Sequence, residues 1–205
     1  MRIESTGGED YNEYKVWLTD TEIDELRRHA NGPRDDILLQ LGAFVGLRAF
    51  EIPQVGPAHV SRSTDGDHYR LRIPQGKDTT GGGGKPRDAC LPASVERDLH
   101  QYQQGADIRP SDEYVDLTTS GVRKAVKRIA RETADATGND DYAKVSSHDL
   151  RRRYAQRLLV DEQMNPRVVM AVGGWDSFAA IEPYLNAPSE RVINDAFSAA
   201  SVGPE

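Results

Sequence analysis

The amino-acid sequence predicts an α+β fold that is mainly α-helical, with a small three-stranded antiparallel sheet at one edge. Apolar residues recur at helical spacing through most of the chain, which is typical of amphipathic helices. Between residues 59 and 91 they alternate with polar residues instead, which is typical of half-buried strands. With 205 residues, the chain is long enough for one large domain around a single hydrophobic core.

The chain is expected to begin with a flexible tail followed by a helix. Residues 1–15 are polar, contain glycine and lack periodicity, so we expect a flexible tail over residues 1–17 and the domain itself over residues 18–200. Thr19 and Glu22 have the spacing of a capping box, which predicts a helix from about Asp20 to His29.

A second helix is expected to begin near Arg34 and to run toward Arg48. A short turn or helix carrying Glu51 should follow it, before Pro53. The apolar residues of this helix recur at helical spacing on one face: Ile37, Leu38, Leu41, Phe44 and Val45.

The predicted sheet centres on residues His68–Ile73, where Tyr, Leu and Ile alternate with polar residues. A turn at Asp65–Asp67 makes His59–Arg62 the partner strand, and a third strand is expected at Arg87–Leu91. The run Thr79–Gly84 ends in four consecutive glycines, which predicts a mobile loop in this hairpin.

Helical spacing returns after Pro92 and predicts five further helices. Asn165 and Pro166 form a suitable cap and first position for one of them. The five ranges are Ala93–Gln103, Gly121–Ala134, His148–Val160, Pro166–Val172 and Ser189–Ala199.

The charge of the chain is unevenly distributed. Asp and Glu outnumber Lys and Arg by 33 to 26, which is unusual for a nucleic-acid-binding protein. An Asp-rich, Lys-poor composition of this kind resembles that of halophile proteins, and the alternative is an ordinary acidic cytosolic protein. Residues 118–170, however, hold 11 Lys and Arg against 7 Asp and Glu, whereas the first 40 residues hold 5 against 10. The basic middle segment is therefore the expected binding region for a polyanion.

Several classes of protein are disfavoured. The longest apolar stretch, Ile37–Leu47, is too short for a membrane span, and no signal segment begins the sequence, so we expect a cytoplasmic location. Cys90 is the single cysteine, which excludes an internal disulfide. The histidines lack metal-ligand spacing, and the glycine run ending at Gly84–Lys85 lacks phosphate-loop spacing, so we expect no metal and no cofactor.

Four segments carry the candidate chemistry. Gly46–Glu51 contains an Arg followed by an acid three residues later, and Gln75-Gly76-Lys77 lies at the tip of the alternating strand. Ser147–Arg151 opens a helix with His and Arg on one face, and Gly173-Gly174-Trp175 precedes Tyr184 by nine residues. Taken alone, Arg48 could equally cap the C-terminus of its helix, and His148 could simply begin one.

Together the four segments resemble, in order and spacing, the tyrosine recombinase (phage integrase) family over residues 18–197. That family has an Arg in a Gly-Leu-Arg-x-x-Glu segment, a Lys on a β-hairpin and a His-x-Leu-Arg motif. A His or Trp follows, with a nucleophilic Tyr nine residues later. The matching residues here are Arg48, Lys77, His148, Arg151, Trp175 and Tyr184.

The resemblance implies strand cleavage and rejoining of DNA through a covalent phosphotyrosine. Tyr184 would attack the scissile phosphate and leave a 3′-phosphotyrosine and a free 5′-hydroxyl, which stores the bond energy without an energy cofactor. Arg48 and Arg151 would stabilise the charged transition state, because a guanidinium is always charged and binds two oxygens at once.

The remaining roles are proton transfer and hydrogen bonding. Lys77, or Lys85 on the same hairpin, would protonate the departing 5′-oxygen. His148 would donate to a phosphate oxygen or help to move the tyrosine proton. Trp175 can only donate, through its indole N–H. Glu51 would orient Arg48 or hold the fold.

The implied partner is double-stranded DNA, bound by a homo-oligomer that forms a synaptic tetramer. The Ser189–Ala199 helix would either dock on a neighbouring protomer or pack on its own domain. The family's N-terminal core-binding domain is expected to be absent, so an accessory DNA-binding protein is a possible partner. The alternatives are a non-catalytic regulator with this fold, a type IB topoisomerase, and a helix-turn-helix factor built on His148–Val172.

Overall fold

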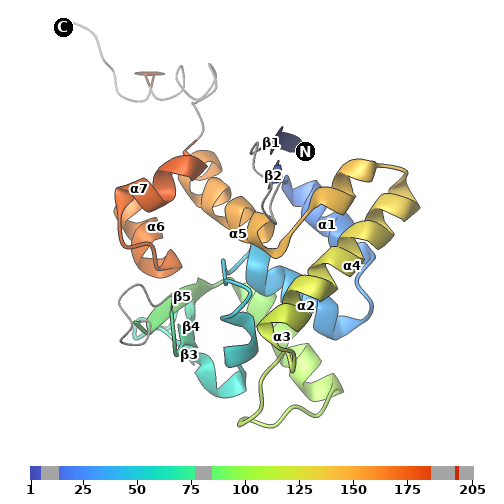
Figure 1. Cartoon of the computed structure of the whole chain (residues 1–205). Helices are drawn as coiled ribbons and strands as arrows, with labels where there is room; N and C mark the ends of the chain where they lie inside the picture. Colours follow the sequence, from blue (N-terminus) through green and yellow to red (C-terminus); the bar gives the residue numbers. More distant parts are fainter. Residues whose placement is uncertain (6–13, 77–84, 186–196, 199–205) are drawn as a thin grey trace, which may run out of the picture.

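The computed structural model describes residues 1–5, 14–76, 85–185 and 197–198. Its elements confirm a mainly helical α+β fold with small antiparallel sheets (Figure 1). The strands are β1 (Arg2–Ser5), β2 (Tyr14–Trp17), β3 (Val60–Arg62), β4 (Tyr69–Ile73) and β5 (Arg87–Leu91). The α-helices are α1 (Asp20–Arg28), α2 (Pro33–Ala43), α3 (Ala93–Gly105), α4 (Thr119–Thr137), α5 (Ser147–Gln156), α6 (Pro166–Gly173) and α7 (Phe178–Ile181).

Short turns of helix connect these elements. A π-helical turn extends α5, so the predicted continuous helix to Val160 changes its hydrogen-bond pattern at Arg157. The 3-10 turns are Ile52–Gln54, Pro57–His59, Asp140–Lys144 and Glu182–Tyr184. No helix among the described residues is long and apolar enough to cross a membrane.

The predicted three-stranded sheet is confirmed, with strand order β3-β4-β5 and antiparallel pairing throughout. Leu71 in the central strand pairs with Val60 on one side and with Ala89 on the other. Its side chain and that of Ala89 are fully buried, so one face of the sheet packs on the core. The glycine-rich run Thr79–Gly84 lies outside the described residues.

The expectation of a flexible tail over residues 1–17 is wrong for the residues that the structure describes. β1 and β2 form a two-stranded antiparallel sheet, with Arg2 opposite Trp17. Val16 is fully buried, and its backbone N–H donates to Asp149 Oδ1 at 3.0 Å. Each of these strands is only four residues long, and Asp149, which holds β2 in place, lies on α5, far away in the sequence. Periodicity therefore could not reveal it.

α1 begins as predicted, with the complete capping box between Thr19 and Glu22. α2, by contrast, ends at Ala43 and does not continue toward Arg48. Gly46 has a left-handed backbone (φ 75°), and a Cβ there would lie 2.3 Å from the Tyr154 ring. The chain changes direction at this turn, so Arg48 does not continue α2, and its side chain binds the Gly174 carbonyl in the C-terminal part of the fold.

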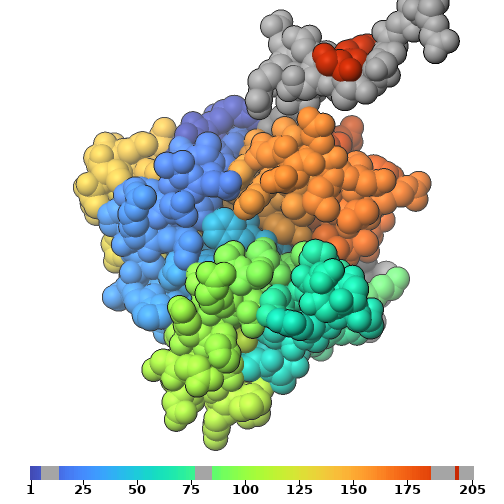
Figure 2. All heavy atoms as spheres, turned by 180° about the vertical axis from the view of Figure 1, so that it is seen from behind, coloured from blue at the N-terminus to red at the C-terminus, as the bar shows by residue number. Residues whose placement is uncertain are grey.

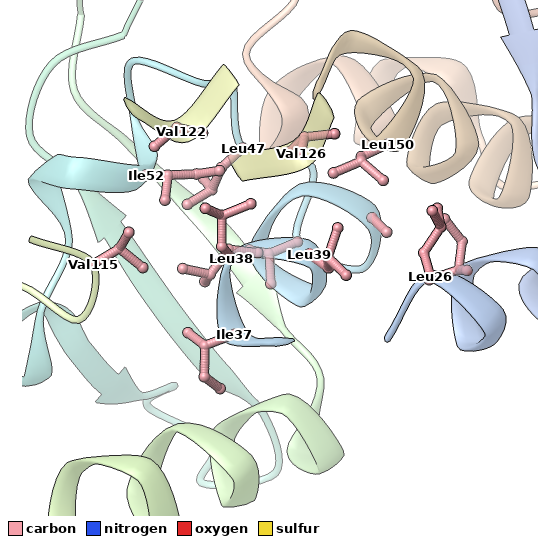
Figure 3. Close-up of a cluster of buried hydrophobic side chains, with 14 of the residues drawn as sticks. Leu26, Ile37, Leu38, Leu39, Leu47, Ile52, Val115, Val122, Val126 and Leu150 are labelled. Atoms are coloured by element: carbon pink, nitrogen blue, oxygen red, sulfur yellow. The ribbon is translucent and has the colours of Figure 1, made fainter. Parts of the chain in front are cut away.

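α2 is the centre of the main core and is buried on nearly all sides, rather than on one face. Figure 3 shows Leu38 and Leu39 of α2 near Val122 and Val126 of α4 and near Leu150 of α5. A second, smaller cluster joins α5, α6 and α7 to β2. Its members are Trp17, Tyr154, Ala155, Leu159, Val169, Trp175, Ile181 and Tyr184.

The C-terminal helices α6 and α7 lie beside the three-stranded sheet, on the opposite side of α5 from α1 and α4 (Figure 1). Seen from behind, the N-terminal segment (blue) and the α5–α6 segment (orange) form adjoining parts of the surface (Figure 2). The predicted helix Ser189–Ala199 lies outside the described residues, apart from Phe197 and Ser198.

The tight turn at Gly46 predicts a specific cost for added side-chain volume. Gly46→Ala should lower the free energy of unfolding by about 3 kcal/mol, from left-handed strain and overpacking against Tyr154. Gly138→Ala is the matched control, because Gly138 also has positive φ (67°) but nothing within 4 Å of its Cβ position. The control should lose only about 1 kcal/mol in urea unfolding. Equal losses would contradict the steric argument.

Candidate active site

Three arginines converge on the carbonyl end of α6. Arg87 Nε donates to the carbonyl of Val172 at 3.3 Å, Arg151 Nη2 to that of Gly173 at 2.7 Å, and Arg48 Nη2 to that of Gly174 at 2.8 Å. These are consecutive carbonyls at a helix C-terminus, where the helix dipole favours positive charge. Gly174 adopts the left-handed conformation that ends the helix. The alternative considered for Arg48 taken alone, capping of its own helix, is not what the structure shows, because Arg48 binds the C-terminus of α6.

Glu51 is the buried counter-charge for this cluster. Its Oε1 accepts from Arg48 Nη1 at 2.8 Å and from Arg87 Nη1 at 2.5 Å. Its Oε2 accepts from the Arg48 backbone N–H at 2.7 Å and from Arg87 Nη2 at 2.9 Å. Burial by itself would raise the pKa of Glu51, but the hydrogen bonds and charge of Arg87 lower it below the usual value. The ionised carboxylate therefore orients Arg48, which is one of the two roles expected for Glu51.

Arg151 lies at the back of the site and is only 1% exposed. Its guanidinium also donates to the Gly46 carbonyl and lies 4.0 Å from the centre of the Trp175 ring. Desolvation, followed by repulsion from Arg48, lowers the pKa of Arg151 to about 9, so the group is still charged at neutral pH. Packing against Trp175 and two carbonyls gives this cation a single orientation.

Tyr184 belongs to the same aromatic cluster. Its ring meets Trp175 edge to face, at 5.7 Å between centroids and an interplanar angle of 61°. The tyrosine is only 7% exposed, and its hydroxyl lies 3.5 Å from His148 Nε2. A Tyr hydroxyl and a His nitrogen at this separation can share a proton after a small approach.

His148 is held in the neutral form. Desolvation by the surrounding protein, followed by repulsion from Arg152, lowers its pKa to about 4, although one side of the residue is exposed. Arg151 and Arg48 act in the same direction. A neutral imidazole has one unprotonated ring nitrogen, which can accept a hydrogen bond.

A basic pocket opens in front of these groups, with a volume of about 1240 Å³. Arg48, His148 and Arg151 contribute to its wall, and α4 supplies the opposite side. The basic residues lining it on α4 are Arg123, Lys124, Lys127, Arg128 and Arg131, with Glu132 and Asp135 as the acidic ones. The local excess of positive charge that the sequence shows over residues 118–170 therefore lies next to the candidate catalytic residues.

The structure brings together Arg48, His148, Arg151, Trp175 and Tyr184, whereas Lys77 lies outside the described residues. Lys85, the alternative hairpin lysine, is exposed, and its carbonyl accepts the Gly76 N–H at 3.2 Å. Both lysines belong to the hairpin whose last strand starts at Arg87.

Sequence reasoning missed Arg87 and misjudged two arginines of α5. Arg87 stands at the start of an exposed-looking strand, and only its pairing with distant Glu51 reveals it. Arg152 and Arg153 belong to the basic segment 118–170, which was expected to bind a polyanion, but both are only 7% exposed. Arg152 pairs with Asp149, and Arg153 pairs with Asp20 and Asp161. They fasten α5 to its surroundings.

The sequence model of the phage integrase family matches residues 17–191 of this chain. No curated protein sequence matches it. XerA recombinase superposes with a TM-score of 0.67 at 18% identity, over 92% of this chain and 66% of XerA. XerH site-specific recombinase, in a pre-cleavage complex with difH substrate, gives 0.62 at 19% identity, over 97% of this chain and 60% of XerH.

The Tn1549 transposon integrase, in complex with transposon right end DNA, gives a TM-score of 0.67 at 15% identity, over 95% of this chain and 69% of the integrase chain. These likenesses show a shared fold. The chain spans less than two thirds of the length of XerA and of XerH.

The low pKa of His148 predicts a pH-dependent stability. Unfolded histidine binds its proton near pH 6.5, whereas His148 in the fold does so near pH 4. The stability contributed by the neutral ring is therefore complete above pH 6.5 and is lost as the pH falls from about 6.5 to about 4. His148→Gln should show a shallower decline in urea unfolding over this range. The same decline in both proteins would contradict the shift.

Proposed function

Since this chain belongs to the phage integrase family, we propose that it is a site-specific DNA recombinase that cleaves and rejoins strands through a 3′-phosphotyrosyl bond at Tyr184. One observation carries the proposal. Five residues that the family pattern predicts, from segments far apart in the sequence, lie together beside one basic pocket. They are Arg48, His148, Arg151, Trp175 and Tyr184. Three of them line its wall, and the other two, Trp175 and Tyr184, contact these three or each other.

In the proposed reaction, the Tyr184 hydroxyl attacks the scissile phosphate and its proton passes to His148. The 3.5 Å separation of the two groups supports this transfer, because an imidazole nitrogen that close to the hydroxyl is within reach of its proton after a small approach. Because Tyr184 is 7% exposed, attack requires it to move toward the pocket when DNA binds. The covalent ester then keeps the energy of the broken phosphodiester for rejoining.

Arg48 and Arg151 would stabilise the charge that develops on the phosphate. Both guanidinium groups line the pocket and are oriented in advance by carbonyls and by Glu51, so little reorganisation is required during the reaction. Trp175 packs its ring on the Arg151 guanidinium and meets the Tyr184 ring edge to face, and its indole N–H can donate to the phosphate.

The departing 5′-oxygen requires a proton, which we assign to Lys77, or to Lys85 on the same hairpin. Strand β5, which begins two residues after Lys85, contacts α6, and Arg87 in it binds Glu51. This places the base of the hairpin beside the arginine cluster. A hairpin lysine could therefore reach the leaving group.

The proposed substrate is double-stranded DNA in the cytoplasm, held by several protomers in a synaptic tetramer. Support for a nucleic-acid substrate comes from the basic wall of α4 and from relatives solved with DNA, among them XerH with difH substrate. We further propose that residues 18–200 act as the catalytic domain of the recombinase. An acidic composition of the halophile type would imply that binding occurs at high salt.

A helix-turn-helix factor built on His148–Val172 fits the structure poorly. A recognition helix exposes its side chains to the major groove. In α5, by contrast, Arg151, Arg152 and Arg153 are buried and bind carbonyls or carboxylates of this chain. The recombinase hypothesis gives buried Arg151 a role at the pocket, whereas the helix-turn-helix hypothesis does not.

The covalent step predicts a tyrosine-specific adduct. Nicked duplexes whose cleavage cannot be reversed should become attached to the wild-type protein and be recovered after denaturation, whereas Tyr184→Phe should yield no adduct. Tyr154→Phe is the matched control, because its ring belongs to the same cluster and its hydroxyl has no hydrogen-bond partner among the described residues. The control should keep the adduct. An adduct in Tyr184→Phe would refute the assignment.

The basic wall predicts a salt-dependent contribution to DNA affinity. Arg123→Ala, an exposed position of α4 in the pocket wall, should weaken binding and reduce the slope of log Kd against log salt concentration by about 1. Arg97→Ala removes the same charge from an exposed position of α3 outside the pocket and should leave the slope unchanged. Fluorescence anisotropy with a labelled duplex measures both. Equal slopes in the two variants would contradict a DNA-binding wall.

A further inference from the structure

Arg87 differs from the other two arginines at the carbonyl end of α6. Its side chain is 9% exposed and does not line the pocket, whereas that of Arg48 is 19% exposed and does. A Cβ at Gly174 would lie 2.7 Å from Arg87 Cδ, so the stem of Arg87 packs directly on the end of α6. Arg87 therefore cannot contact DNA in this arrangement, but it touches the groups that hold Arg48.

The link between the two arginines is the shared carboxylate. Each oxygen of Glu51 accepts one hydrogen bond from Arg87 and one from Arg48, and the Glu51 side chain is fully buried. Both arginines also bind the end of α6, Arg87 at Val172 and Arg48 at Gly174. Arg87 thus contacts both anchors of Arg48 without occupying the pocket.

We propose that Arg87 is a positioning residue, which sets the orientation and charge of Arg48 by sharing Glu51 and by bracing the Val172–Gly174 turn. The inference rests on the proposed function, because it assigns a purpose to the orientation of Arg48. Three guanidinium groups and one carboxylate leave a net positive charge facing the pocket. With Arg87 in place, Glu51 is neutralised by a residue that never leaves the interior, and Arg48 can turn one edge toward a phosphate.

If Arg87 is removed, Arg48 should therefore bind Glu51 more tightly. Among the described residues, the buried carboxylate would be left with hydrogen bonds from Arg48 alone, and a buried charge that has lost one of its partners is strongly unfavourable. Arg48 would then be drawn away from the pocket. A displacement of about 1 Å in a catalytic group can cost about 100-fold in rate.

The test compares Arg87→Met with the wild type in single-turnover adduct formation on the nicked duplex. We expect the rate at saturating DNA to fall about 10- to 100-fold, while Kd for DNA changes less than about threefold because Arg87 does not line the pocket. Arg87→Lys keeps the charge without the planar fork and should recover part of the rate. Arg72→Met is the matched control, since Arg72 pairs with exposed Asp88 on the same sheet, and it should cleave at the wild-type rate.

A second substitution separates positioning from a merely structural role. In Arg87→Met, adding Glu51→Gln removes the charge that holds Arg48, so the double variant should cleave faster than Arg87→Met alone. If Arg87 only stabilised the fold, the double variant would be slower still, with a lower melting temperature. An unchanged rate in Arg87→Met, or equal losses in rate and affinity, would overturn the proposal.

A readout independent of cleavage keeps the two proposals distinguishable. The Nε–H signal of Arg48 in a 15N-labelled protein, assigned with Arg48→Lys, should shift in Arg87→Met and stay in place in Arg72→Met. An unmoved signal would overturn the positioning role, whether or not the protein cleaves DNA. Absence of any wild-type adduct would instead refute the proposed function, and the Arg48 signal would still decide whether Arg87 positions it.

Discussion

The mutual repulsion of three clustered guanidinium groups is the constraint around which the rest of the site is arranged. Arg48, Arg87 and Arg151 lie together in a largely buried region, where like charges repel strongly. One buried carboxylate, Glu51, and three consecutive carbonyls at the end of α6 supply the compensating negative charge. Because a helix C-terminus offers several unpaired carbonyls pointing the same way, it can hold several cations at once.

Binding the arginines in this way requires left-handed backbone turns at two glycines, Gly46 and Gly174. The carbonyl of Gly46 accepts from Arg151, and the left-handed turn there leaves no room for a side chain beside Tyr154. At the other end, left-handed Gly174 finishes α6 and leaves its carbonyl free for Arg48. Trp175 is the next residue after Gly174, and its ring packs on Arg151. The turn whose carbonyls bind the arginines therefore leads directly into the aromatic cluster that contains Tyr184. The proposed nucleophile and the proposed phosphate-binding groups are thus connected through one turn.

The distribution of charge explains how an acidic protein can present a basic pocket. Acidic side chains of the N-terminal half pair with arginines that the fold has buried or half-buried, as Asp20 does with Arg153 and Asp35 with Arg128. The exposed cations of α4 remain around the pocket, with only Glu132 and Asp135 among them. The net charge of a protein mainly affects its solubility, whereas the binding of a charged ligand depends on the electrostatic potential at the surface where it binds.

The helical α+β class, the three strands of the main sheet and the start of α1 could be predicted from the sequence, which also proposed five candidate site residues that lie together in the fold. These candidates are Arg48, His148, Arg151, Trp175 and Tyr184. These follow from local signals, because periodicity, capping and motif spacing depend on neighbours in the chain. Only the tertiary structure decided the β1–β2 pairing, the early end of α2 at Ala43, the burial of Arg152 and Arg153, and the place of Arg87. Each of these depends on a partner far away in the sequence: Asp149 for Val16, Tyr154 for Gly46, Asp20 for Arg153 and Glu51 for Arg87. A contact between distant residues leaves no periodic trace in either segment, so it becomes visible only when the chain is folded.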